Sequence, residues 1–452
     1  MSRYNSSEQS EVYWGTRAGF ILAALGAAAG IGNIWRFAYI AGENGGGVFF
    51  FIYLICIAII GLPILMAELV IGRAIRPDAA GSADGAKRIR QWNLFGPLAV
   101  LTAFVILSYY SAIAGWALKY LIGAGTGALW DRAAAGYGLF FASFVGSTWE
   151  PLAWQALMLG FTVWIVSAGI RNGIERANRV LMPGLLIIVI ALAAFGLTLP
   201  GARQGLAFMF APDWQVLADP NVYIAAMGQG FFSLGVGMAI YVTYGRYIRP
   251  SYGIAGSAGI VVIGDSLIAA LAGVAIFTAV FTFGLNPAEG PELAFITLPQ
   301  IFLVMPGGHI VAVAFFALLV AGALTSMVSI LEVPVAFLEQ RSRWPRRRIA
   351  LSVAAASLLI GIPSTLGFGV LSDIVWRGRG IMDNLDYAVS NMLLPAGGIL
   401  IAVYVGWLWK ASDARAAAFA NNHLIARLWH ALLKYVAPAL TAIIIVRALL
   451  TG

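Results

Sequence analysis

Long apolar runs recur along almost the whole chain, and they constrain its fold more than any other feature. A helix that crosses the hydrocarbon core of a membrane needs about 20 mostly apolar residues. The chain is 61% hydrophobic and only 11% charged, whereas soluble domains average about 25% charged residues. The sequence therefore predicts an all-α integral membrane protein without a separate soluble domain.

Eleven runs are long enough to span a membrane as helices. We place them at residues 17–40, 46–72, 95–122, 152–169, 178–199, 223–247, 252–284, 309–340, 349–367, 384–409 and 429–450.

The basic residues between these runs indicate the orientation of the chain. Alternate loops are rich in Arg and Lys, for example 73–90 and 341–348, whereas the loops between them hold few. Cytoplasmic loops carry this excess, so we expect a cytoplasmic N-terminus and, after eleven helices, an outer C-terminus in the inner (cytoplasmic) membrane. The net charge of +8 thus marks topology, and we expect no nucleic-acid partner.

Two runs, 17–40 and 223–247, contain glycine clusters next to a polar side chain. Asn33 follows Gly32 in the first run, and Ser233 lies among four glycines in the second. A break in a membrane helix frees backbone groups that cost several kcal/mol each without partners. These segments therefore predict broken helices whose oxygens bind ions, with close helix packing as the alternative for either segment alone.

Ten of the helices divide into two groups of five. Because an odd number of helices precedes the second group, it starts inverted, which is typical of transporters that bind substrate near the bilayer midplane. We predict one membrane domain, 1–452, with inverted repeats at 16–199 and 222–409 and an additional helix at 428–450. The loops 123–151 and 285–308 are long enough to fold over the outer mouth.

Few polar residues lie inside the runs, so each is a candidate for function. Thr325 and Ser326 present adjacent hydroxyls that suit a hard cation, although such hydroxyls often bond back to their own helix. Arg36 and Asp386, near outer helix ends, are candidates for a lid pair. We find no catalytic motif, so we expect no enzyme and no catalytic residue.

These residues also carry a resemblance to a known family. Gly-Ile-Gly-Asn-Ile-Trp-Arg-Phe over 30–37 and Glu-Asn-Gly-Gly-Gly over 43–47 resemble the first-helix signature of the neurotransmitter:sodium symporter family. Glu68, Tyr110 and the stretch 229–232 agree in order and spacing. The resemblance covers residues 14 to about 409 and extends to the short, eleven-helix bacterial members that carry hydrophobic amino acids on the leucine-transporter fold, with helices 1 and 6 broken.

The resemblance implies two sodium sites. The first would consist of the Ala28 carbonyl, the side chains of Asn33, Ser233 and Asp265, and the carboxylate of the substrate. The second would consist of the carbonyls of Gly26, Ala29 and Gly322 and the hydroxyls of Thr325 and Ser326.

It also implies a substrate pocket and two gates. The pocket residues would be Ala28, Gly30, Gly32, Ile106, Tyr110, Phe232, Gly235, Met238, Ser326 and Ile330. The outer gate would be Arg36 with Asp386, and the inner gate would include Trp14 and Tyr247. The inner Arg–acid pair of the family cannot form, because Glu11 and Gln340 stand in its place; Arg341 or Arg343 is a possible partner for Glu11.

Two positions restrict the expected substrate class and the expected chloride requirement. Amine transporters of the family have an aspartate where this chain has Gly30, so we expect a substrate that brings its own carboxylate. Chloride-dependent relatives have asparagine where this chain has Asp265, and a serine at the position of Ala269. Because Asp265 supplies the negative charge itself, we expect no chloride requirement.

The resulting expectation is a sodium-coupled symporter that imports neutral, mainly hydrophobic or aromatic L-amino acids with two sodium ions. The alternatives are a channel, an amino-acid-binding membrane sensor, and a sodium symporter for another small zwitterion or amine. The oligomeric state stays open.

Overall fold

The computed structural model describes residues 13–76, 83–130, 136–287, 293–419 and 423–451. These residues form helices joined by turns and contain no β-strand beyond one isolated bridge between Trp376 and Arg379. Within them, eight helices are long and apolar enough to cross a membrane, and a bent helix pair makes a ninth candidate span. The predicted all-α membrane fold is therefore confirmed.

The helices follow the predicted runs closely. In chain order they are α2 (Arg17–Ala28) with η1 (Gly32–Arg36) and α3 (Phe37–Glu43), α4 (Gly47–Cys56) with η2 (Ile57–Gly61) and α5 (Leu62–Ala74), α6 (Ala83–Thr126), α8 (Glu150–Ser167), η5 (Ile170–Glu175) with α9 (Arg176–Gly196), α11 (Pro220–Leu234) with α12 (Ile240–Gly245), α13 (Ile254–Thr282), α15 (Gly308–Glu339), α16 (Arg346–Leu366), α17 (Ile381–Ala388) with η8 (Val389–Leu393) and α18 (Leu394–Gly406), and α20 (His423–Ala431) with η9 (Leu432–Val436) and α21 (Ala437–Thr451).

Two details differ from the sequence prediction. Helix α6 begins at Ala83, twelve residues before the predicted start at Phe95, so it extends well beyond its apolar part. The predicted spans at α8 and at α11–α12 lie outside the nine candidates. Helix α11 has only 15 residues before its break, and α8 has 18, among them the polar Glu150 and Gln155. The total of eleven spans stays a prediction.

The first break lies between α2 and η1, where the axes differ by 49°. Helix α2 starts at Thr16, whose hydroxyl accepts the N–H of Gly19 and caps the helix. The N–H of Gly30 turns back to the carbonyl of Ala28 at 2.8 Å instead of continuing the helix. Carbonyls near the end of α2 are thereby released from the helical pattern.

The second break lies between α11 and α12. Gly235 has a φ of +66° and Gly237 a φ of +92°, a backbone region that favours glycine. The buried carboxylate of Glu68, on α5, accepts the N–H groups of Gly237 at 2.7 Å and Tyr241 at 3.1 Å. The Tyr241 hydroxyl donates to the Leu234 carbonyl at 2.8 Å, so side chains satisfy backbone groups on both sides of the break.

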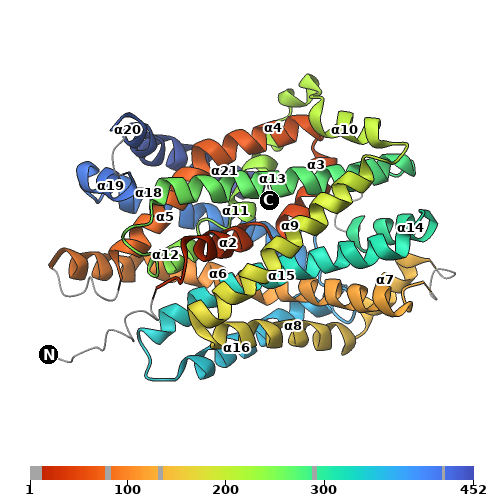
Figure 1. Cartoon of the computed structure of the whole chain (residues 1–452), viewed down its shortest axis with the longest axis horizontal. Helices are drawn as coiled ribbons and strands as arrows, with labels where there is room; N and C mark the ends of the chain where they lie inside the picture. The colour runs from red at the N-terminus through yellow and green to blue at the C-terminus, as the bar shows by residue number, and fades with distance from the viewer. Residues whose placement is uncertain (1–12, 77–82, 131–135, 288–292, 420–422, 452) are drawn as a thin grey trace.

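The broken helices lie at the centre of the molecule, where Figure 1 places α2, α11 and α12 among the longer helices. Helix α15 packs on α6 and α2, while α4 packs on α11. The last span, Leu424–Leu450, lies at the periphery, since only 28% of its most apolar 18-residue stretch is buried.

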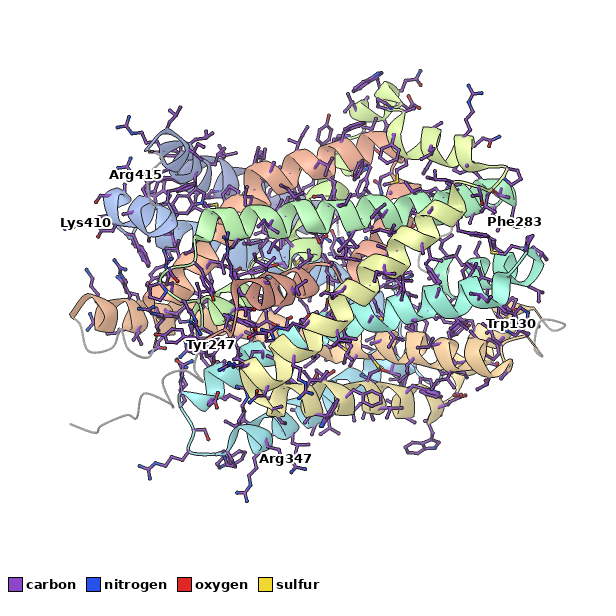
Figure 2. The ribbon with its side chains drawn as sticks, viewed as in Figure 1. Trp130, Tyr247, Phe283, Arg347, Lys410 and Arg415 are labelled. Atoms are coloured by element: carbon purple, nitrogen blue, oxygen red, sulfur yellow. The ribbon has the colours of Figure 1, made fainter. Side chains whose placement is uncertain are left out.

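Short helices cover one end of the bundle. They are α7 (Tyr137–Gly146), α10 (Ala202–Phe210), η6 (Trp214–Ala218) and α14 (Thr297–Val304). Figure 1 shows α7, α10 and α14 at this end, and α19 (Ala411–Ala418) with α20 at the other. Figure 2 places Trp130 and Phe283 at the first end and Lys410 and Arg415 at the second, with Arg347 at the lower edge of the view. The two long loops predicted to fold over one mouth thus supply α7 and α14 to the same end.

Candidate functional site

Three side chains predicted for the first sodium site meet in the core. Asn33 and Ser233 come from the two broken helices, and Asp265 comes from the middle of α13; all are buried. The Asn33 amide donates to an Asp265 carboxylate oxygen at 2.6 Å, and the Ser233 hydroxyl donates to the other at 2.9 Å. Ser233 also lies 3.0 Å from the Asn33 amide oxygen. The cluster combines oxygen ligands with one carboxylate, which suits a hard cation.

Four residues of the predicted second sodium site, Gly26, Gly322, Thr325 and Ser326, also converge. The Ser326 hydroxyl lies 3.3 Å from the Gly26 carbonyl of α2, across the helix interface. Thr325 donates to the Gly322 carbonyl of its own helix at 3.0 Å. This is the bond within the helix that the sequence left open as the alternative to cation binding. That carbonyl is itself a predicted ligand, so the bond keeps two site oxygens together. Oxygens around a six-coordinate hard cation with bonds of about 2.4 Å are about 3.4 Å apart, similar to these separations.

A small cavity lies next to both clusters, since Ser326 lines it, as do Gly32 and Phe232, the residues just before Asn33 and Ser233. Nine of the ten predicted pocket residues line it, and Ala27 completes the lining; the residues are Ala27, Ala28, Gly30, Gly32, Ile106, Tyr110, Phe232, Met238, Ser326 and Ile330. The tenth, Gly235, lies behind Met238, since a Cβ added there would be 2.9 Å from the terminal carbon of that side chain. The cavity measures about 20 Å³, roughly the space of one water. An amino acid enters only if the lining side chains move.

Gly30 is surrounded too closely to carry a side chain. A Cβ there would lie 2.8 Å from the Tyr110 hydroxyl and would collide with the Ser326 hydroxyl. The same Tyr110 hydroxyl accepts the N–H of Ile31 at 3.1 Å. The break therefore presents backbone and hydroxyl groups to the cavity, without room for a carboxylate at this position.

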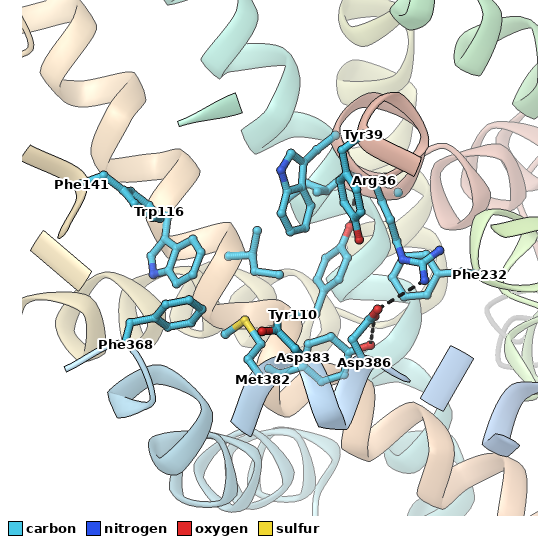
Figure 3. Close-up of a pocket in the computed structure, with 15 residues that line it drawn as sticks. Arg36, Tyr39, Tyr110, Trp116, Phe141, Phe232, Phe368, Met382, Asp383 and Asp386 are labelled. Carbon is cyan, nitrogen blue, oxygen red and sulfur yellow. Dashed lines mark hydrogen bonds and ion pairs between the residues drawn. The ribbon is translucent and has the colours of Figure 1, made fainter. Parts of the chain in front are cut away.

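Arg36 and Asp386 lie beyond Phe232, which is part of the cavity lining. Their side chains lie 3.3 Å apart, and Arg36 also donates to Gln229 at 2.6 Å. The guanidinium lies over the Phe232 ring, 4.5 Å from its centroid, as Figure 3 shows. The Tyr109 hydroxyl donates to Asp386 at 3.0 Å. The two residues predicted as an outer lid are thus in contact, directly above Phe232.

A larger cavity of about 240 Å³ lies on the far side of this contact. Its walls are mainly aromatic, with Trp116, Phe141 and Phe368 on one side and Asp383 beside Asp386 away from them. Gly32, Tyr110 and Phe232 line both cavities and so form the wall between them, whereas Arg36 and Asp386 line only the outer one.

Trp14, predicted for the inner gate, is buried against α12. The side chain is fully buried, and its indole N–H donates to the Tyr244 carbonyl at 3.1 Å. Tyr247 contributes its backbone, because its carbonyl accepts the Trp14 N–H at 3.0 Å. Gln340 donates to the Ala336 carbonyl of its own helix. Glu11 lies outside the described residues, so its pairing stays a prediction, and Arg341 bonds to Asn93.

Comparison with known proteins decides the family. The model of the "Sodium:neurotransmitter symporter family" matches residues 11–137 and 144–451, nearly the whole chain. The chain belongs to this family. Because this is a family of transporters, the prediction that the protein is not an enzyme is confirmed.

Individual members of the symporter family resemble the chain over its full length. It is 37% identical over 451 residues to the uncharacterized sodium-dependent transporter YhdH of Bacillus subtilis, covering 99% of both chains. It is 32% identical over 460 residues to an uncharacterized sodium-dependent transporter of Haemophilus influenzae, again covering 99% of both chains. The crystal structure of MhsT in complex with L-phenylalanine shares 46% identity and a TM-score of 0.90, covering 96% of this chain and 99% of that chain.

Two residues beside the predicted symporter sites were missed by the sequence analysis. The Tyr53 hydroxyl donates to Asp265 at 3.1 Å and lies 2.9 Å from the Ser233 hydroxyl. Buried Glu175 accepts the N–H groups of Gly15 at 2.7 Å and Thr16 at 3.1 Å, and so holds the start of α2. Tyr53 lies in an aromatic run typical of any membrane helix, and Glu175 lies in a predicted loop, so neither position stood out.

Proposed function

We propose that the protein is a sodium-coupled symporter that imports neutral, mainly hydrophobic or aromatic L-amino acids. The observation that carries this proposal is the small cavity flanked by two oxygen clusters, with Gly30 at its centre. The crowding at Gly30 leaves no room for an ammonium-binding carboxylate, so the substrate supplies the carboxylate. The solved neighbour at 46% identity was crystallised with L-phenylalanine, which has this chemistry.

Two sodium ions per substrate fit the two clusters. The first ion would bind Asn33, Ser233 and Asp265 together with the substrate carboxylate, and so couple substrate binding to ion binding. The second would bind at the oxygens of Gly26, Thr325 and Ser326 and hold α2 against α15. Because the substrate is zwitterionic, each ion carries one charge inward, worth about 2.3 kcal/mol per 100 mV.

Alternating access follows from closures on both sides of the small cavity. The Arg36–Asp386 contact would open toward the outer cavity, and the Trp14 seal would open toward the cytoplasm. The helix contacts support two related repeats. Helix α9 packs on α13 and α15, and its predicted counterpart α18 packs on α5 and α6, the counterparts of α13 and α15.

Transport would be independent of chloride. Three donors, from Tyr53, Ser233 and Asn33, surround the Asp265 carboxylate where an anion would otherwise balance the sodium charge. The fixed carboxylate takes that role. The protein would lie in the inner membrane with a cytoplasmic N-terminus, since the basic side chains of Lys410 and Arg415 lie at one end.

Uptake into proteoliposomes tests the proposal. With an inward sodium gradient, labelled L-phenylalanine should accumulate above its external concentration, and accumulation should disappear when choline replaces sodium. A panel of the twenty amino acids as competitors should give the strongest inhibition with large apolar side chains. Binding without accumulation would indicate a sensor, and equilibration without concentration would indicate a channel; either result contradicts symport.

A further inference from the structure

Asn178 on α9 lies against the second oxygen cluster. Its side chain is fully buried, and its amide nitrogen donates to the Ile174 carbonyl at 2.9 Å. This bond fixes which end of the amide is nitrogen. Its oxygen has no hydrogen-bond partner among the described residues. A buried, unpaired amide oxygen costs about 1–3 kcal/mol, so it is expected to serve a ligand.

The free oxygen points at Gly26. If Gly26 carried a Cβ, that atom would collide with the Asn178 oxygen and lie 3.1 Å from the Cβ of Thr325. The oxygen therefore reaches the interface of α2 and α15 between two residues of the proposed second sodium site. The absence of a side chain at position 26 makes this approach possible.

We infer that Asn178 is a further ligand of the second sodium site, a role that rests on the proposed symport. Its amide oxygen would join the carbonyls of Gly26, Ala29 and Gly322 and the hydroxyls of Thr325 and Ser326. Amide oxygens are good ligands for hard cations, and they add coordination without adding charge. The third helix at this site, α9, would thereby contact the ion together with α2 and α15.

The two neighbouring residues on this side, Glu175 and Met182, do not suit the role of a sodium ligand. Glu175, about one turn earlier, is occupied by the backbone N–H groups of Gly15 and Thr16 and by Arg179. Met182, about one turn later, brings its sulfur to the same point, 3.2 Å from a Cβ added at Gly26. A thioether is a soft ligand and does not suit sodium. Asn178 is thus the oxygen ligand that α9 offers here.

Sodium-dependent thermal stabilisation of the purified full-length protein tests the role of Asn178. Sodium chloride is titrated against choline chloride at constant ionic strength without amino acid, and the unfolding midpoint is followed. The variant Asn178→Leu removes the oxygen at similar size, and Asn178→Asp keeps an oxygen but loses the donor to Ile174. Thr441→Val is the matched control, because it removes another buried, unpartnered polar atom, on peripheral α21.

We expect N178L to raise the half-saturating sodium concentration at least fivefold, and N178D to keep it within twofold of wild type or lower it. T441V should leave it unchanged. Equal sodium dependence in N178L and wild type would overturn the role. A similar increase of the half-saturating sodium concentration in N178L and N178D would also overturn it, because it would indicate that the amide has only a structural role. If N178L does not fold, Asn178→Ala takes its place with the same expected increase, and N178D remains the comparison. A wild-type protein without sodium stabilisation or uptake would instead contradict the proposed function.

Discussion

At the scale of single residues, Gly30 restricts the substrate through the space around it. Replacing it with aspartate, the residue of amine transporters, places a side chain against Tyr110 and Ser326. Overpacking typically costs about 1–3 kcal/mol, so we expect sodium-driven uptake of L-phenylalanine to fall at least about tenfold in Gly30→Asp, without gain of amine transport. Gly160→Ala, at a position with open space around it, is the control and should transport normally.

Uptake by Gly30→Asp at the wild-type rate would contradict the claim that the space around Gly30 excludes a side chain. So would new sodium-dependent uptake of an amine lacking a carboxylate, because it would mean that the cavity accommodates the added side chain.

Asp265 determines the expected chloride dependence. In wild type, replacing chloride with gluconate should leave uptake unchanged. Asp265→Asn removes the balancing charge and should reduce uptake at least about tenfold, since leaving a buried charge without its partner costs about 3–5 kcal/mol. Adding Ala269→Ser restores the residue pair of the chloride-dependent relatives and should return part of the activity, but only in chloride. Equal recovery of the double variant in gluconate would refute this assignment.

At the scale of elements, the break between α11 and α12 depends on one side chain from α5. Glu68 accepts the N–H groups of Gly237 and Tyr241, and each would otherwise be unpaired in the core. Leaving them unpaired costs about 1–3 kcal/mol each. Glu68→Leu should lower the unfolding midpoint and abolish uptake, and Glu68→Gln, which keeps one acceptor, should have a smaller effect in both measurements.

The control is Glu150→Gln on half-exposed Glu150, whose ion pair with Lys119 contributes little. If Glu68→Leu were as stable as this control, the carboxylate would not be what satisfies the break.

The sequence predicts the broken elements well because glycine clusters are rare in membrane helices without cause. Asn33 and Ser233 were identifiable for the same reason, as polar side chains next to those clusters. Tyr53 and Asn178 were not, because each lies on an intact helix. Their importance depends on the residues that they face on other helices, which no local sequence pattern encodes. The early start of α6 was missed because its first residues are polar, and hydropathy locates the membrane part of a helix rather than its end.

At the scale of the whole molecule, the topology can be tested by labelling single cysteines. Cys56 is the natural cysteine and is buried, so Cys56→Ser provides the background. Gln215→Cys in η6 and Ser412→Cys in α19 place exposed thiols at opposite ends. In intact cells, a membrane-impermeant maleimide should label Gln215→Cys alone, and both after lysis. Labelling of Ser412→Cys in intact cells would reverse the orientation.

The meeting of Asn33, Ser233 and Asp265 has a consequence for the timing of the transport cycle. These side chains come from α13 and from both interrupted helices, and a cation bound among them would hold three parts of the protein with one charge. Its departure would leave only the hydrogen bonds of Asn33 and Ser233 to Asp265 between these parts, so loss of the ion would loosen all three together. Backbone amides in all three segments should then exchange with solvent in step as sodium is withdrawn.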